Sequence, residues 1–218
     1  MPPARAAWTL ANLSFNHPHF LNEEHPIKMR AKLIATVALT ALVSLPAMAE
    51  QAMDPNVMEA RKIVKQFVTQ LKGELKKAMK AGGPAHAISV CNDKAPRITD
   101  EVSAQTGWYV ARTSLKPRAA TNSPLPWEKK VMEQFEARKA AGEDVKRLEY
   151  HDVVEEDGKR VFRYMKAIPT GKVCLNCHGG AEVKPEVEKK LHELYPSDKA
   201  RGFKVGDIRG AFVLKKTL

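Results

Sequence analysis

The sequence of 218 residues has only three cysteines, no internal repeats, no low-complexity tract and no long apolar run. Its longest apolar run, residues 33–45, falls short of the roughly 20 residues that a membrane-spanning helix needs. Acidic residues are also outnumbered, with 25 Asp and Glu against 36 Lys and Arg and a net charge of +11. The hydrophobic share of 44% nevertheless excludes an intrinsically disordered chain. These features predict a basic, globular protein.

The N-terminal residues have the pattern of an export signal. Met29 opens a short basic stretch, an apolar run follows, and Ala47-Met48-Ala49 has the small-x-small form of a signal peptidase site. We predict a cleaved signal peptide at 29–49, preceded at 1–28 by a mis-assigned start or an unstructured extension. An uncleaved membrane anchor is the alternative, which the short apolar run disfavours. The mature chain, 50–218, is then expected to be one periplasmic domain with no stable membrane insertion.

Periodicity within the mature chain predicts an α+β fold. Apolar residues recur at helical spacing over 55–81 and again from Pro84, with Gly82-Gly83 between the two helices, and Pro96 predicts a kink or break in the second. The remaining predicted elements are a short strand at 108–110, a loop at 113–126, a helix from Trp127, a hairpin turning at Asp157-Gly158, a helix from Pro185 and a strand at 208–214. Helices followed by a mostly antiparallel sheet form an α+β order. The continuous apolar stripe of the first helix suggests a homodimer contact.

The sequence Cys174-Leu175-Asn176-Cys177-His178 carries the strongest chemical signal. Two thiols three residues apart can each form a thioether with a haem vinyl group, and the adjacent imidazole can then bind the iron. A thioredoxin-type disulfide is disfavoured because the motif precedes a Gly179-Gly180 loop rather than opening a helix after a buried strand. A zinc site is disfavoured because there is no second cysteine pair. We predict one covalent haem c.

The sequence offers several residues as the second axial ligand of the iron and does not single out one of them. Met132 and Met165 lie on elements that can face a haem, although core packing is the more frequent role of methionine. Three histidines have weaker claims as surface residues: His86, His151 and His192. Cys91 lies on the apolar face of its helix and has no disulfide partner once the haem takes the other two thiols. It is equally explained as a ligand and as a small buried hydrophobe.

Several strings resemble the family of Tll-type mono-haem c cytochromes. They are residues 87–96 (AISVCNDKAP), Thr106-Gly107-Trp108, residues 112–118 (RTSLKPR), the Cys174-x-x-Cys177-His178-Gly179 motif and residues 206–211 (GDIRGA), and they occur in the same order over nearly all of the mature chain. The resemblance implies a PAS-like fold with an antiparallel sheet and a haem held between a histidine and a cysteine thiolate. It makes His178 the proximal ligand and Cys91 the distal one.

Cationic residues give two further expectations. Arg112, Lys116 and Arg118, in the polar segment before Trp127, are candidates to bind a haem propionate, with Arg112 the first of them, because a guanidinium suits bidentate contact with a carboxylate. Residues 50–218 carry 32 basic and 23 acidic residues, a net charge of +9. These charges are dispersed, which disfavours nucleic acid and favours docking to an acidic redox partner.

The number of protein ligands expected on the haem iron predicts the function. A six-coordinate haem predicts an electron carrier. The alternative is a redox or gas sensor with a labile Cys91 ligand, a role supported by relatives of the family that act as sensory modules. A peroxidase-type enzyme needs an open iron position, which a bound Cys91 would close, so we do not expect an enzyme.

Overall fold

The structure, a computed structural model, describes residues 53–218. The predictions for 1–28 and 29–49 lie outside the described residues. Four helices, two short 3-10 turns and four strands alternate along the described chain. The predicted α+β class, with its antiparallel sheet, is confirmed. In this part of the chain no helix combines the length and apolar character needed to span a bilayer.

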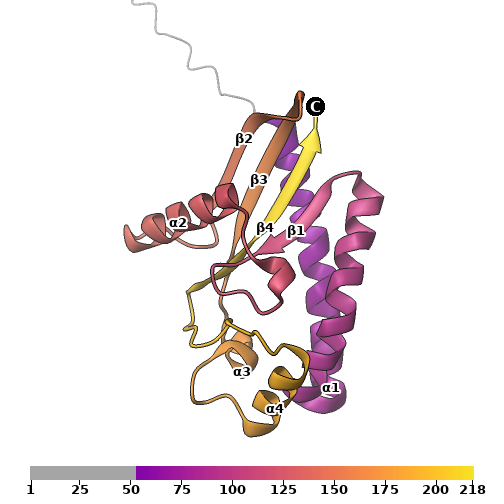
Figure 1. Ribbon diagram of the computed structural model, residues 1–218, viewed down its shortest axis with the longest axis vertical. Coiled ribbons are helices and arrows are strands. Elements are labelled where there is room, and N and C mark those ends of the chain that lie inside the picture. Colours follow the sequence, from indigo (N-terminus) through magenta and orange to yellow (C-terminus); the bar gives the residue numbers. More distant parts are fainter. Residues whose placement is uncertain (1–52) are drawn as a thin grey trace, which may run out of the picture. The chain divides into compact units, whose positions relative to one another are not determined.

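The helix α1 (Pro55–Thr106) is folded back on itself into two arms that lie side by side (Figure 1). The bend is at Gly82-Gly83, where Gly83 has a φ of 71°, a left-handed value that side chains rarely adopt. The predicted separation at these glycines is therefore confirmed. Pro96 does not end the second arm, because helical geometry continues to Thr106. Val57, Ala60, Ile63 and Phe67 of the first arm pack inside the same chain, so much of the predicted stripe is already covered.

The sheet consists of β1 (Tyr109–Thr113), β2 (Glu149–Glu156), β3 (Lys159–Pro169) and β4 (Ile208–Thr217), in the order β1-β4-β3-β2. All neighbouring strands are antiparallel. The β2–β3 hairpin turns at Asp157 and Gly158, whose φ values of 50° and 71° fit the predicted type I′ turn. The last strand, β4, lies between β1 and β3 and so joins the N-terminal half of the domain to the hairpin.

Two hydrophobic cores lie on opposite faces of the sheet. The α1 arms cover one face, where Phe67 meets Phe212 with ring centroids 5.3 Å apart. The helix α2 (Pro126–Ala140) covers the other face through Val131, Met132 and Phe135. The helices that cover the two cores, α1 and α2, lie on different sides of the strands in Figure 1. One end of the domain is closed by α3 (Leu175–His178) and α4 (Pro185–Leu194), which pack against α1 through Ile88. The segment between β3 and β4 thus carries the cysteine motif to the α1 side.

Candidate cofactor site

A cavity of about 930 Å³ lies between the α1 arms, the end of the sheet and the α3–α4 segment. Its α1 wall is largely apolar and includes Val64, Val68, Leu71 and Ile88. This volume is at the upper end of the range for small-molecule and cofactor sites. All three cysteines of the chain line it, as does His178. The cavity therefore brings together side chains that are up to 87 residues apart in the sequence.

His178 is held in one tautomer by the backbone. Its Nδ1 lies 3.0 Å from the carbonyl oxygen of Ala200, and since a carbonyl only accepts, Nδ1 carries the proton. The other ring nitrogen, Nε2, is then the basic one. Burial lowers the pKa of His178 well below its usual range, and the positive charges of Arg209 and Arg118 act in the same direction. The ring is thus neutral at pH 7, which is the form that binds a metal.

A buried ion pair fixes the loop that supplies this carbonyl. Arg118 Nε is 3.2 Å from Asp198, and the Arg118 Nη2 donates to the carbonyl of Cys177. Asp198 accepts the backbone N–H of Ala200 at 2.8 Å. The two side chains, 14% and 7% exposed, therefore tie the cysteine motif and the loop after α4 into one unit. Because Ala200 orients His178, the pair acts on the position of the imidazole.

Cys91 lies on the second arm of α1 and faces the cavity, as its apolar helical position predicts. Burial raises the pKa of this thiol, and the nearby charges of Arg112 and Arg118 only partly oppose that effect. Burial likewise raises the pKa of Cys177, and a Cys91 thiolate would raise it further, so the two sulfurs lie within electrostatic range of each other. Cys91 by itself is thus a thiol near neutral pH.

Three arginines also line the cavity: Arg112, Arg118 and Arg209. Arg112 is the predicted propionate-binding candidate, and its guanidinium lies 5.6 Å from the centre of the Phe67 ring. Arg209 was missed as a functional residue. The signal in the sequence was that Arg209 lies within residues 206–211 (GDIRGA), one of the strings that resemble the family.

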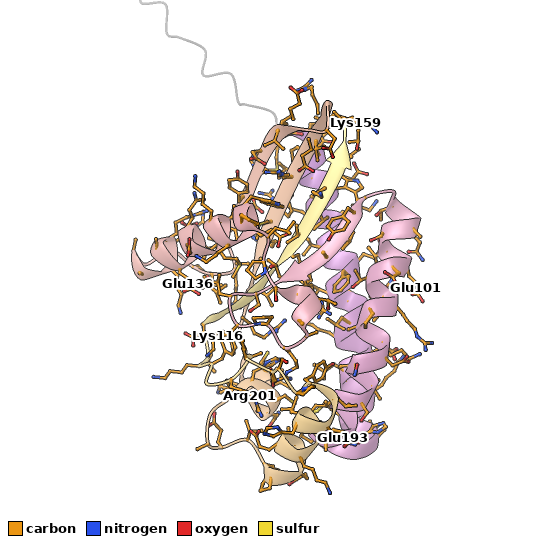
Figure 2. All side chains as sticks on the ribbon, viewed as in Figure 1. Glu101, Lys116, Glu136, Lys159, Glu193 and Arg201 are labelled. Atoms are coloured by element: carbon orange, nitrogen blue, oxygen red, sulfur yellow. The ribbon has the colours of Figure 1, made fainter. Side chains whose placement is uncertain are left out.

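Other candidate residues lie elsewhere. Lys116 is exposed and does not line the cavity; its ammonium donates to the carbonyl of Arg201 and lies 4.7 Å from the centre of the Phe203 ring. Figure 2 shows Lys116 and Arg201 close together. Met132 and Met165 are fully buried in the core on the α2 face, away from the cavity lining. The three candidate histidines are exposed: His86, His151 and His192.

The sequence of this chain matches the model of a known protein family. The family model described as Tll0287-like, Tll0287, matches residues 47–216. The chain belongs to the Tll0287-like family. This confirms the predicted resemblance, and the match covers both Cys91 and the cysteine motif.

A solved structure supports the same fold for this Tll0287-like chain. The crystal structure of the cyanobacterial haem-protein Tll0287 matches with a TM-score of 0.58 and 23% sequence identity. The match covers 76% of this chain and 97% of that one. No functionally curated protein matches the chain.

The cavity of this family member has the kinds of side chain that bind a haem cofactor. Two thiols and a neutral imidazole come from one motif, a third thiol comes from α1, and cations and apolar side chains complete the wall. Within residues 53–218, no group of three or more His, Cys, Asp and Glu side chains is arranged to hold a bare metal ion. The residues present therefore fit a haem, which brings its own four nitrogen ligands.

Proposed function

We propose that this chain is an exported mono-haem c-type cytochrome that transfers electrons. The observation that carries the proposal is the convergence of Cys91 and the Cys174–His178 motif on one cavity. The similarity of its fold to the crystal structure of the cyanobacterial haem-protein Tll0287 supports it. When bound, haem supplies an iron centre that accepts and releases one electron.

The residues of the cavity have separate roles in this proposal. Cys174 and Cys177 hold the cofactor through thioethers, and His178 presents Nε2 as the proximal ligand because Ala200 fixes its Nδ1–H. Cys91, from the α1 wall of the cavity, would be the second protein ligand of the iron. The apolar α1 wall would cover one side of the cofactor and reduce its contact with water, which limits the change in solvation on electron transfer.

The first experiment tests attachment and export together. The intact mass of protein isolated from the periplasm should equal a chain that begins near Glu50 plus one haem. A species without haem but with a disulfide between Cys174 and Cys177 would contradict the cytochrome proposal. Protein that retains residues 29–49 would contradict cleavage of the signal peptide and leave haem attachment intact.

The second experiment tests the ligands. Cys91→Ala should open the distal position, raise the midpoint potential and allow fast binding of carbon monoxide, because a thiolate stabilises ferric iron. His178→Ala should keep the covalent haem and convert its spectrum to high spin. His86→Ala is the matched control, since His86 is exposed on the same helix arm as Cys91. A Cys91→Ala spectrum identical to that of the parent would place the distal ligand elsewhere.

A sensor is the second candidate function, and the environment of Cys91 favours it. Burial raises the pKa of this thiol despite two neighbouring arginines, which favours the neutral thiol over the thiolate when the sulfur is not bound to a metal. A ligand that leaves as a neutral thiol on reduction is what a sensor needs. Carbon monoxide binding to the reduced parent protein separates the two functions. No binding supports the electron carrier, whereas slow binding with loss of the thiolate signature supports the sensor.

The partner is proposed from charge. A protein with a net charge of +9 in residues 50–218 should dock an acidic redox protein, and the association should weaken as salt rises. Electron-transfer rates with an acidic and a basic carrier, measured across an ionic-strength series, test this. Equal rates with both carriers would contradict it. Homodimer formation through α1 also stays a prediction, and analytical ultracentrifugation tests it.

A further inference from the structure

A β-bulge interrupts β4 beside the cavity. Along this strand, Leu214 and Phe212 belong to the core on the α1 face, and Val213 and Ala211 belong to the core on the α2 face. The pairing with β3 then skips a residue: Ile168 is opposite Gly210, but Pro169 is opposite Ile208. Arg209 is the extra, unpaired residue of this bulge.

The bulge reverses the direction of the side chains that precede it. Strict alternation would place Arg209 on the α2 face and Ile208 on the α1 face. Ile208 instead packs in the α2-side core, and Arg209 lines the cavity on the α1 side together with Phe212. The extra residue thus exchanges an apolar side chain for a cation in the cavity wall.

Two contacts with the segment after β1 hold this geometry. Ser114 Oγ donates to the carbonyl of Arg209 at 2.7 Å. A Cβ atom at Gly210 would lie 2.4 Å from the carbonyl oxygen of Thr113, so only glycine allows the two backbones to come this close. The position of Arg209 is therefore fixed by the backbone on both sides of the bulge.

The guanidinium groups of Arg209 and Arg112 have no carboxylate partner in the described chain. Within residues 53–218, the arginines that form ion pairs are Arg61, Arg97, Arg118, Arg138, Arg163 and Arg201. Burial, together with the charges of Arg112 and Arg118, lowers the pKa of Arg209 to about 10, so the group is still charged at pH 7. Burying a charge without a partner is costly. Both side chains are half-buried and line the cavity, and neither has an acidic partner among the described residues to balance its charge, so the cavity wall favours an anionic ligand.

We propose that Arg209 and Arg112 together form a two-guanidinium site for the two propionate carboxylates of the cofactor. This inference rests on the proposed haem function and adds Arg209 to the binding residues. Arg118 is not part of the site, because it already donates to Asp198 and to the carbonyl of Cys177. Each planar guanidinium can bind one carboxylate through two parallel N–H donors.

The test compares Arg209→Gln, Arg209→Lys and the parent protein, each purified with its covalent haem. The resonance Raman band of propionate bending should shift in Arg209→Gln, since a hydrogen-bond donor to the carboxylate is lost. The midpoint potential should fall, because a removed positive charge no longer stabilises the reduced cofactor. In Arg209→Lys the potential should return toward the parent value, and the Raman band should not, since Lys cannot provide the two-donor contact. Arg163→Gln, which removes a charge from β3 outside the cavity lining, is the control and should leave the Raman band unchanged.

The outcomes separate this inference from the proposed function. An Arg209→Gln protein with attached haem, an unchanged Raman band and an unchanged potential overturns the two-arginine site and leaves the cytochrome intact. A parent protein that carries no haem overturns the function itself. If Arg209→Gln does not accumulate, Arg209→Lys and Arg112→Gln are compared with the parent, and two unchanged Raman bands overturn the site.

Discussion

Replacing Asp198 with Ala perturbs the loop that orients His178. The Asp198 carboxylate accepts the N–H of Ala200 at 2.8 Å, Nε of Arg118 at 3.2 Å and Nε of Arg201 at 3.1 Å. The substitution removes all three contacts at once and leaves two guanidinium groups without this acceptor.

The expected cost follows from the burial of the groups. Removing one partner of a fully buried ion pair destabilises a protein by about 3–5 kcal/mol. Here Asp198 is 7% exposed, but Arg118 is 14% exposed and Arg201 is 27% exposed and also contacts Glu188. Residual solvation reduces the expected loss to about 2–3 kcal/mol, which is roughly a 30- to 150-fold change in the unfolding equilibrium.

Urea unfolding followed by far-UV circular dichroism measures this loss for Asp198→Ala, Arg118→Ala and the double variant. The coupling energy between Asp198 and Arg118 should exceed about 1 kcal/mol. The exposed pair Asp93–Arg97, with side chains 50% and 63% exposed, is the control and should couple by no more than about 0.5 kcal/mol. Equal coupling in the two pairs would show that the Arg118–Asp198 contact does not hold the loop.

Three further predictions concern the scaffold. Burial opposes ionisation of Glu149, but hydrogen bonds, first among them that from Arg61, lower its pKa to about 2. The stability that the ionised Glu149 contributes is therefore complete above its ordinary pKa of 4.5 and is lost as the pH falls toward 2. Acid unfolding followed by circular dichroism should be steeper in the parent than in Glu149→Gln. Gly158→Ala should lower the free energy of unfolding by about 1–2 kcal/mol, because φ at Gly158 is 71°. Gly73→Ala, at a helical position with free space around it, should instead raise the melting temperature. Equal effects of the two substitutions would show that the hairpin turn does not need glycine. Phe67→Ala should cost about 3–5 kcal/mol in urea unfolding, since its side chain is fully buried, and a loss below 1 kcal/mol would contradict that packing.

Features that depend on neighbouring residues could be predicted from the sequence. Gly82-Gly83 ends the first helix arm because glycine alone adopts the required left-handed φ without strain, and Asp157-Gly158 forms a tight hairpin turn for a related reason. Pro96 was overestimated as a break. It lies within a helical stretch whose apolar side chains, such as Ile98 and Val102, are buried in the core shared with the first arm, and this packing keeps the segment helical.

The sequence by itself determined the chemistry of the Cys174–His178 motif, because the three donors are held together by the chain and need no distant partner. Only the tertiary structure decided what faces them. The folding back of α1 brings Cys91 to the same cavity, while the packing of α2 buries Met132 on the other side of the sheet. Arg209 reaches the cavity because β4 pairs with β3 around one extra residue, and the direction of a strand side chain depends on that register.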